Sequence, residues 1–365
     1  MHEVFAGYVD RREVGRLVAL IERRGRLQVD CIGCERDAIF RIASMTKPVA
    51  AAAAMILVEE ARLRLDDPVD ELLPELANPR VLRRPDGPVE DTVPASRSIT
   101  LRDLLTFRLG TGLLLAPPDS YPIQRAIDEA GIGPGPPDPE KYPHPDAWMR
   151  NFGAVPLIHQ PGEVWMYNTG AEVLGVLIAR ASKRSFGDFL AERIFEPLGM
   201  RDTGFYAPHE KLHRLAIDDE SLRERWGRPP AFESGGGGLV STADDYLSFS
   251  RMMLAGGSKI LSRPAVETMT MDHLTPEQKA RSPWVPAGYW ENHGWGFGMT
   301  VVTKRFDIAS TPGQYGWDGG LGTSWRADPA EQMTTILLTS TPWSSPSPPD
   351  VFRDFWTLAY STIED

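Results

Sequence analysis

Ser44 and Lys47 are the residues of this sequence whose types and spacing most directly suggest chemistry. They stand at the junction between a short apolar segment, Ala38 to Ile42, and an Ala-rich segment from Met45 to about Leu65 that is predicted to form a buried helix. Because residues three apart share one face of a helix, the lysine is expected beside the serine hydroxyl. A serine becomes a nucleophile when a base takes its proton, and burial and the helix dipole can lower the pKa of a lysine for this task.

The same pair also has a purely structural interpretation. Ser44 stands where a helix N-cap is expected, and Pro48 is tolerated in the first turn because the first N–H groups of a helix have no intrahelical partner. In that case Ser44 is a cap and Lys47 is a solvated side chain. The apolar character of the helix favours the catalytic interpretation, because its first turn then opens into the protein and not into bulk water.

Two other motifs could bind a metal ion or a phosphate group, but the sequence lacks the partners that each requires. Cys31 and Cys34 form a Cys-x-x-Cys pair, with no second pair or histidine cluster to complete a zinc site. They lie in a Gly-containing turn, whereas redox cysteines are typical of helix N-termini. The glycine run 235–238 lacks a P-loop lysine and a preceding strand, which favours close backbone packing. We therefore expect no metal and no cofactor.

Composition limits the classes of partner. The 365 residues are 42% hydrophobic with 10 Trp, which is sufficient for a real core in about two domains. A net charge of −11 argues against nucleic acids and anionic membranes as partners. There is no apolar window long enough for a transmembrane helix and no signal-peptide pattern at the first residues. We expect a cytoplasmic protein with a small-molecule substrate, and the oligomeric state stays open.

Hydrophobic periodicity predicts the elements that must position these residues. In chain order it predicts a helix over residues 3–24, a hairpin of residues 27–31 and 38–42, the central helix, a short helix ending at Pro74, a helix capped by Thr100 with Asp103, a buried helix from near Thr169, a helix from Phe186 to Leu198, strands within 295–302, 314–329 and 333–340, and a terminal helix from Phe352 to Ile363.

Residues 110–162 differ from the rest of the chain. They are rich in Gly and Pro, and aromatic residues such as Tyr121 and Tyr142 are interleaved with them. This composition is not expected to form long regular elements, yet it has too many aromatic residues for a disordered segment. We predict that it forms a wall of the substrate pocket, and that Trp284–Trp290 also contributes to specificity.

Strands near both ends and helices between them predict an α+β fold. In this arrangement residues 1–62 and 235–365 form an α/β sandwich with an antiparallel sheet built from both ends of the chain. Residues 63–234 form an inserted, mostly helical domain.

Three motifs in register give this chain a family resemblance. They are Ser44-Met-Thr-Lys47, Tyr167-Asn-Thr169 and Trp317-Asp-Gly319. With them the chain resembles the serine β-lactamase and penicillin-binding-protein superfamily along nearly its whole length, and it is most similar to the class C β-lactamase-like esterases, the family VIII carboxylesterases. The resemblance implies a β-lactamase/transpeptidase-like fold.

The resemblance also implies roles for single residues. Ser44 would be the acylated nucleophile, Lys47 its proton acceptor, and Tyr167 a proton donor or acceptor whose pKa an adjacent ammonium lowers. The oxyanion hole would be the backbone N–H groups of Ser44 and Gly320. The further substrate-binding positions would be Trp317, Asp318, Gly319, Thr169 and Tyr121. The structural alternative for Tyr167 is an ordinary core aromatic residue.

Two departures from the β-lactamase pattern point to an esterase. Thr169 stands where those enzymes have an Asn that contacts the substrate amide, and Trp317 stands where they have a Lys or His that holds the substrate carboxylate. Losing that cation removes a charge-assisted contact of about 1.5–3 kcal/mol. We therefore predict a carboxylesterase for small neutral esters that works through an acyl-enzyme intermediate. The alternatives are a β-lactamase or D-Ala-D-Ala peptidase, an amide hydrolase, an acyltransferase, or a non-catalytic scaffold with this fold.

Overall fold

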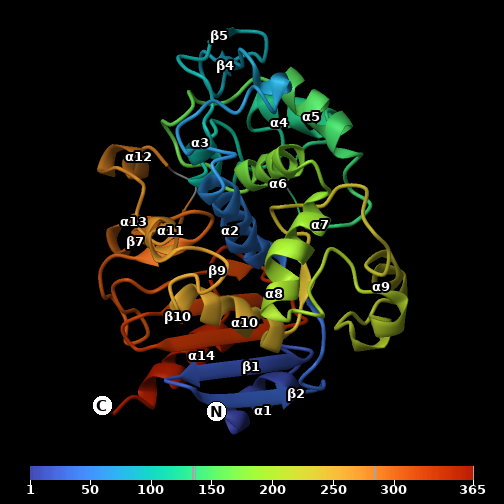
Figure 1. Ribbon diagram of the computed structural model, residues 1–365, viewed down its shortest axis with the longest axis vertical. Coiled ribbons are helices and arrows are strands. Elements are labelled where there is room, and N and C mark those ends of the chain that lie inside the picture. Colours follow the sequence, from blue (N-terminus) through green and yellow to red (C-terminus); the bar gives the residue numbers. More distant parts are fainter. Residues whose placement is uncertain (134, 136, 283–284, 365) are drawn as a thin grey trace.

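The computed structural model describes residues 1–133, 135, 137–282 and 285–364. Its base is an antiparallel sheet of seven strands in the order β2-β1-β11-β10-β9-β8-β7, so that the first strands of the chain pair with the last (Figure 1). The strands are β1 (Leu17–Arg23), β2 (Arg26–Ile32), β7 (His293–Trp295), β8 (Thr300–Val302), β9 (Tyr315–Gly319), β10 (Thr323–Asp328) and β11 (Met333–Thr339). The predicted α+β fold and the predicted antiparallel sheet are confirmed.

Helices cover both faces of this sheet. Helices α1 (His2–Asp10) and α14 (Asp350–Ser361) pack on one face, where Phe5 and Phe355 belong to one buried cluster (Figure 1). On the other face lies α10 (Ala243–Leu254), which is tied to β10 by a hydrogen bond from Trp325 Nε1 to Ser250 Oγ of 2.8 Å. Because both faces are covered, β11 is buried along its whole length and is apolar or Thr at every position.

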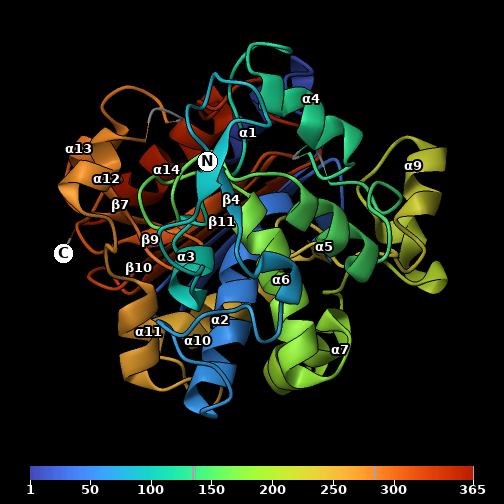
Figure 2. The same ribbon diagram turned by 90° about the horizontal axis from the view of Figure 1, so that it is seen from above.

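The central helix α2 (Thr46–Glu59) connects the sheet to the helical part of the molecule. It is buried from Thr46 to Leu57, and its run of alanines allows α6 (Thr169–Ser182) to lie over it, as Figure 2 shows from above. The helix ends at Glu59, earlier than the predicted end near Leu65. Ser44 lies before it in a 3₁₀ turn, Ala43–Met45, and its side chain makes no capping hydrogen bond. The predicted N-cap role of Ser44 is therefore wrong.

Short helices and two small strand pairs complete the structure. The helices are α3 (Leu101–Leu105), α4 (Pro122–Glu129), α5 (Pro145–Ala154), α7 (Phe186–Leu190), α8 (Glu196–Leu198), α9 (Glu220–Arg225), α11 (Arg263–Met269), α12 (Pro276–Ala280) and α13 (Tyr289–Asn292), with 3₁₀ turns at Pro74–Leu76 and His209–Arg214 and a π turn at Ala191–Phe195 between α7 and α8. The strand pairs are β3 (Phe40–Arg41) with β6 (Val240–Ser241) and β4 (Arg80–Leu82) with β5 (Thr92–Pro94).

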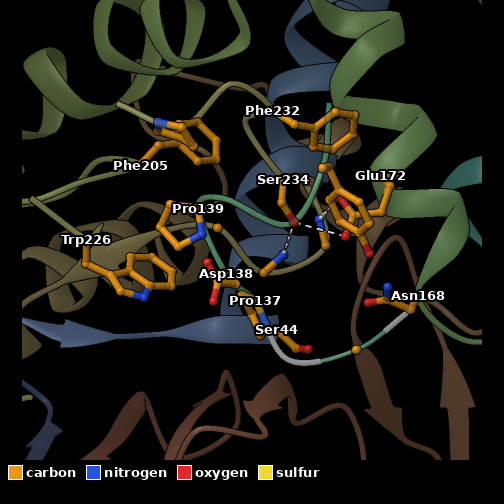
Figure 3. Close-up of a pocket in the computed structure, with 16 residues that line it drawn as sticks. Ser44, Pro137, Asp138, Pro139, Asn168, Glu172, Phe205, Trp226, Phe232 and Ser234 are labelled. Atoms are coloured by element: carbon orange, nitrogen blue, oxygen red, sulfur yellow. Dashed lines mark hydrogen bonds between the residues drawn. The ribbon is translucent and has the colours of Figure 1, made fainter. Parts of the chain in front are cut away.

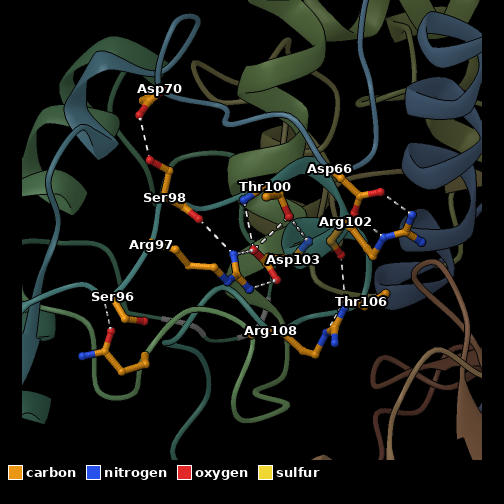
Figure 4. Close-up of polar contacts among 12 residues, drawn as sticks. Asp66, Asp70, Ser96, Arg97, Ser98, Thr100, Arg102, Asp103, Thr106 and Arg108 are labelled. Atoms are coloured by element: carbon orange, nitrogen blue, oxygen red, sulfur yellow. Dashed lines mark hydrogen bonds and ion pairs between the residues drawn. The ribbon is translucent and has the colours of Figure 1, made fainter.

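The predicted capping box at the start of α3 is confirmed. Thr100 Oγ1 accepts a hydrogen bond from Asp103 N–H, and the Asp103 carboxylate accepts one from Thr100 N–H (Figure 4). The same buried carboxylate accepts two hydrogen bonds from Arg97, of 2.6 and 2.9 Å. The Asp103 side chain thus accepts a hydrogen bond from the free backbone N–H at the start of α3 and also holds Arg97 in the loop that leads into the helix.

The N-terminal prediction is wrong beyond Asp10. Residues 17–23 form β1, which pairs with β2 on one side and β11 on the other, where a helix was predicted. An uninterrupted apolar run fits a buried strand and a buried helix equally well, so periodicity cannot separate them. The hairpin joins β1 to β2 through Arg24 and Gly25, which have φ of +49° and +77°. The predicted partner of β2, residues 38–42, instead supplies β3, which pairs with β6.

Residues 110–162 contain more regular structure than predicted. Helices α4 and α5 begin at Pro122 and Pro145, because proline is well suited to the first helical position. Of the segment Trp284–Trp290, Trp284 lies outside the described residues. No helix among the described residues is both long and apolar enough to cross a membrane.

Candidate active site

Ser44 and Lys47 lie side by side where the sheet meets α2. Lys47 is buried, with 1% of its surface exposed, and its Nζ lies 2.9 Å from Ser44 Oγ. Lys47 Nζ also donates to Asn168 Oδ1 at 2.8 Å and to the carbonyl oxygen of Gly236. Ala43, directly before Ser44, has a φ of +45°, in the left-handed region that few side chains adopt. This sharp turn places the hydroxyl in front of the lysine.

The partners of Lys47 decide what its amine can do. Asn168 Oδ1 and the Gly236 carbonyl oxygen can only accept hydrogen bonds, so they take both N–H groups of a neutral amine. The remaining lone pair is then left for the proton of Ser44. Burial lowers the pKa of Lys47 from its ordinary 10.5 to about 7, which makes this neutral form available near neutral pH.

Tyr167 is the third member of the cluster. Its Oη accepts a hydrogen bond from Trp317 Nε1 at 2.7 Å, and its hydroxyl group also hydrogen bonds with the Ser44 side chain. Lys47 Nζ lies 4.5 Å from the centroid of its ring. The ring packs among other aromatic rings, and this burial raises the pKa of Tyr167, where a lowered pKa was predicted. Tyr167 is therefore a neutral phenol with a proton to give.

Strand β9 borders the cluster on the sheet side. Trp317 holds Tyr167, whereas the Asp318 carboxylate forms a two-bond ion pair with Arg326, of 2.7 and 2.8 Å. Gly319 is buried, and a Cβ there would lie 2.3 Å from the Ile42 carbonyl oxygen, so only glycine lets β9 approach the turn that carries Ser44. Gly320 is exposed beside it, and its carbonyl oxygen accepts a 2.9 Å hydrogen bond from Trp343 N–H.

Two cavities meet at Ser44. The large cavity, of about 600 Å³, has walls that are mostly apolar and aromatic, and its lining includes Ser44, Leu113, Leu115, Trp165, Tyr167, Tyr289, Trp317, Asp318, Gly320, Trp343 and Trp356. The small cavity, of about 50 Å³, is shown in Figure 3, and its lining includes Ser44, Pro137, Asp138, Tyr142, Asn168, Glu172, Phe205, Phe232, Ser234 and Gly236. Segment 110–162 thus contributes wall residues to both.

The remaining predicted substrate-binding residues lie away from these walls. Thr169 is the buried first residue of α6, and Tyr121 precedes α4 with its backbone N–H donating to Gln124 Oε1. Thr169 and Tyr121 are not among the described residues that line the two cavities, and Gly319 is not among them either. Their roles toward substrate stay predictions.

Asn168 and Glu172 belong to the site but were not predicted. Asn168 has φ +82° and ψ −62°, and Thr169 N–H donates to the Tyr167 carbonyl oxygen at 3.2 Å, which is the geometry of a γ-turn. The turn directs the Asn168 side chain to Lys47. Glu172 lies buried one helical turn later. In the sequence, Asn168 is noticeable only as the neighbour of Tyr167, and Glu172 only as a lone carboxylate in an apolar helix. Neither feature predicts which residue the side chain will contact.

The Cys-x-x-Cys pair lies at the end of β2. Cys31 and Cys34 are free thiols and half-buried, and burial raises the pKa of both. Within the described ranges, no group of three or more His, Cys, Asp or Glu side chains could hold a metal ion.

Comparison with known proteins adds a family context to this geometry. The family model described as Beta-lactamase matches residues 1–353. The chain is 38% identical to Protein Rv1367c of Mycobacterium tuberculosis, over 89% of this chain and 85% of that protein. It is 29% identical to Esterase EstB of Burkholderia gladioli, over 86% and 80% of the two chains. The solved structure of EstCE1, a hydrolase with promiscuous acyltransferase activity, superimposes with a TM-score of 0.78 at 23% identity, covering 98% of this chain and 97% of that one.

Proposed function

Since the chain belongs to the beta-lactamase family, we propose that it is a serine hydrolase that cleaves small neutral carboxylic esters through an acyl-enzyme intermediate. The observation that carries the proposal is the set of contacts around Lys47. Two obligate acceptors hold its N–H groups, and the third partner of its Nζ is Ser44 Oγ. This arrangement suits the removal of one proton from one hydroxyl group.

Acylation follows from these contacts. Ser44 Oγ attacks the ester carbonyl carbon while its proton moves to Lys47 Nζ, and the carbonyl oxygen becomes an oxyanion facing the backbone N–H groups of Ser44 and Gly320. The bond to the alcohol oxygen then breaks, and that oxygen takes a proton from Tyr167, which recovers it from the Lys47 ammonium. In deacylation the water oxygen attacks the acyl carbon while a water proton moves to Lys47 Nζ. The bond between the acyl carbon and Ser44 Oγ then breaks, Ser44 Oγ takes the proton back from Lys47, and the carboxylic acid leaves.

The walls of the large cavity support a neutral substrate. The side chain that opens the third motif is Trp317, whose indole N–H is already donated to Tyr167. Arg326 on the neighbouring strand is paired with Asp318 and offers little to a substrate carboxylate. Arg353, the other arginine among the described lining residues, is paired with Asp350, and a mostly apolar cavity of about 600 Å³ suits a small molecule without charge. EstB, one of the relatives, is named an esterase, which agrees with this choice.

Acyl transfer to an alcohol is the second candidate. The large cavity has room for an acceptor alcohol in the place of water, and EstCE1 is described as a hydrolase with promiscuous acyltransferase activity. Adding a primary alcohol to the ester assay separates the two. A true transferase converts most of the acyl-enzyme to the new ester, whereas a hydrolase releases mainly the acid.

The test of the proposal compares chromogenic substrates. We expect p-nitrophenyl acetate and butyrate to be hydrolysed, nitrocefin and the matching anilides to react far more slowly, and Ser44→Ala to lose at least about 1,000-fold in kcat/KM. A fluorophosphonate probe should add its mass to the Ser44 peptide. Wild-type turnover in Ser44→Ala, or an unlabelled Ser44, contradicts the proposal and favours a non-catalytic scaffold.

A further inference from the structure

Glu172 is a buried carboxyl group that the reaction described above does not use. It lies in the first turns of α6 and only 5% of its surface is exposed. One carboxylate oxygen accepts a 2.9 Å hydrogen bond from Ser234 Oγ, and the other accepts one of 3.3 Å from Gly236 N–H (Figure 3). A carboxyl group is rarely buried this deeply without a charge partner.

Gly236 connects this carboxyl group to the catalytic lysine. Its N–H donates to Glu172, and its carbonyl oxygen accepts from Lys47 Nζ. A Cβ at this position would lie 2.3 Å from Glu172 Oε1, so the close approach requires glycine. Asn168, four residues before Glu172, takes the other N–H of Lys47. One end of α6 therefore positions both acceptors of the lysine, Asn168 directly and Gly236 through Glu172.

Lys47 is also the main charge that acts on Glu172. Burial raises the pKa of Glu172, and the positive charge of Lys47 is the largest influence against that rise. In return, of the charged groups in the part of the chain that the structure describes, Glu172 is the one that raises the pKa of Lys47 against the effect of burial. The other titratable groups that face Glu172 are the exposed Lys141 and the Tyr142 phenol, from the segment that walls the small cavity, and the neutral Tyr167 next to α6.

We propose that Glu172 is a positioning residue of the active site, which holds Gly236 against Lys47 and supplies the negative charge that stabilises Lys47 when it becomes an ammonium group. The proposal rests on the proposed function, because it concerns the step in which Lys47 takes the Ser44 proton. No bond to Glu172 forms or breaks. Its carboxylate keeps two hydrogen bonds throughout, and the proton gained by Lys47 leaves with the alcohol.

The experiment is the pH dependence of kcat/KM for ester hydrolysis in Glu172→Gln. Glutamine keeps the size of the side chain and removes its charge, so the pKa of Lys47 should fall further and the acid limb of the profile should move to lower pH by about one unit or more. The plateau value of kcat should also fall, by about 10- to 100-fold, because the ammonium form has lost its counter-charge.

Glu233→Gln is the matched control. Glu233 is a half-buried carboxyl group directly before Ser234 in the same loop, but it accepts from Gly187 N–H, away from Lys47. It should leave the acid limb where it is in the wild type. A Glu172→Gln profile whose acid limb coincides with that of the wild type, or an equal shift in Glu233→Gln, overturns the proposal.

A second variant covers the case in which Glu172→Gln does not fold. Ser234→Ala removes a hydrogen bond that favours the ionised form of Glu172, so the pKa of Glu172 rises and part of the carboxyl group is protonated. Less negative charge then acts on Lys47, and the acid limb should move in the same direction by a smaller amount. An unmoved limb in this variant also overturns the proposal. Ser44→Ala distinguishes failure of the esterase proposal from failure of the Glu172 proposal. If Ser44→Ala retains wild-type turnover, the esterase proposal fails. If Ser44→Ala is inactive while the acid limb of Glu172→Gln stays at its wild-type pH, only the role of Glu172 fails.

Discussion

At the scale of single residues, the site consists of one amine and the groups that surround it. The Ser44, Lys47 and Tyr167 cluster was predictable, because each residue type carries its own chemistry and the three motifs occur in register. The surroundings of Lys47 were not predictable. The contact of Asn168 depends on a γ-turn, and that of Gly236 on a loop from a distant part of the chain, so neither is encoded in local spacing.

The buried amine predicts a pH profile. Lys47 must be neutral to act as a base, and burial lowers its pKa to about 7, so kcat/KM should be constant above this pH and fall tenfold per unit below it. Lys47→Arg should lose at least about 1,000-fold in kcat/KM at every pH, because a guanidinium cannot give up its proton in this range. Steady-state assays from pH 5 to pH 9 measure both. A profile that stays flat down to pH 5 contradicts the assignment of Lys47 as base.

Trp317 is expected to act through Tyr167. Trp317→Phe keeps an aromatic wall but removes the N–H that donates to Tyr167 Oη. We expect kcat to fall about 5-fold with little change in KM, since a hydrogen bond worth about 1 kcal/mol that orients Tyr167 is lost. Combining it with Tyr167→Phe should add almost nothing to the loss caused by Tyr167→Phe alone, because both remove parts of one unit. Fully additive losses in this double-mutant cycle show that the two residues act separately.

At the scale of elements, a helix or strand could be predicted when the residues that determine it are close together in the sequence. The cap at Thr100 was predictable because its side chain bonds to the helix that it begins, and the helix from Thr169 was predictable because its apolar periodicity lies within the helix itself. The strand β1 was not, because its apolar run is decided by a partner at the far end of the chain. The prolines of α4 and α5 were misread as breakers, because a first-turn proline and a loop proline look alike in sequence.

The start of α3 offers a stability prediction. Asp103→Ala leaves the first turn uncapped and deprives Arg97 of its partner, so the free energy of unfolding should fall by about 2–3 kcal/mol. The control is Asp66→Ala, which breaks the two-bond pair with Arg102 shown in the same view (Figure 4). Asp66 is 72% exposed, so its loss should cost less than about 1 kcal/mol. Urea unfolding measures both, and equal losses contradict the prediction.

Because β9 contacts the Ser44 turn closely, alanine substitutions at the neighbouring residues Gly319 and Gly320 should affect stability very differently. In Gly319→Ala the new methyl group would lie 2.2 Å from Thr323 Oγ1 and 2.3 Å from the Ile42 carbonyl oxygen, so β9 must move away. We expect a loss of about 1–3 kcal/mol in stability together with a reduced kcat. In Gly320→Ala the methyl group meets no atom within 4 Å, so the unfolding midpoint should hardly change. Thermal unfolding of the pair is the measurement, and an unperturbed Gly319→Ala would disprove the tight contact.

At the scale of the whole molecule, the site is assembled from parts that are far apart in sequence. Ser44 and Lys47 come from the beginning of the chain, Tyr167 from its middle and Trp317 from its end. The class of fold was predictable because strands cluster near both ends of the sequence. The boundaries at 62 and 235 stay predictions. The wall of the large cavity was beyond prediction, since it includes residues from α14 and from loops whose packing has no periodic signal.

This assembly predicts how a fragment behaves. Residues 63–234, expressed alone, lack α2, against which the buried face of α6 packs. We expect a helical but loosely packed species that binds the dye ANS and unfolds without a sharp transition. Far-UV circular dichroism and ANS fluorescence test this, with the full chain as control. A fragment that unfolds cooperatively and binds no dye shows that the region is an independent folding unit.

The pairing of β1 with β11 also has a consequence for folding during translation. Leu17 lies opposite Thr339, so the apolar strand β1 leaves the ribosome long before its neighbour exists. At translation rates of about 5–20 residues per second, the interval lasts roughly 15–60 s. During that time β1 can pair with β2, but its other edge has no partner, and an exposed apolar strand edge is the type of segment that chaperones bind. Ser44 is likewise synthesised well before Trp317, so the cluster around Lys47 can form only after strand β9 has left the ribosome.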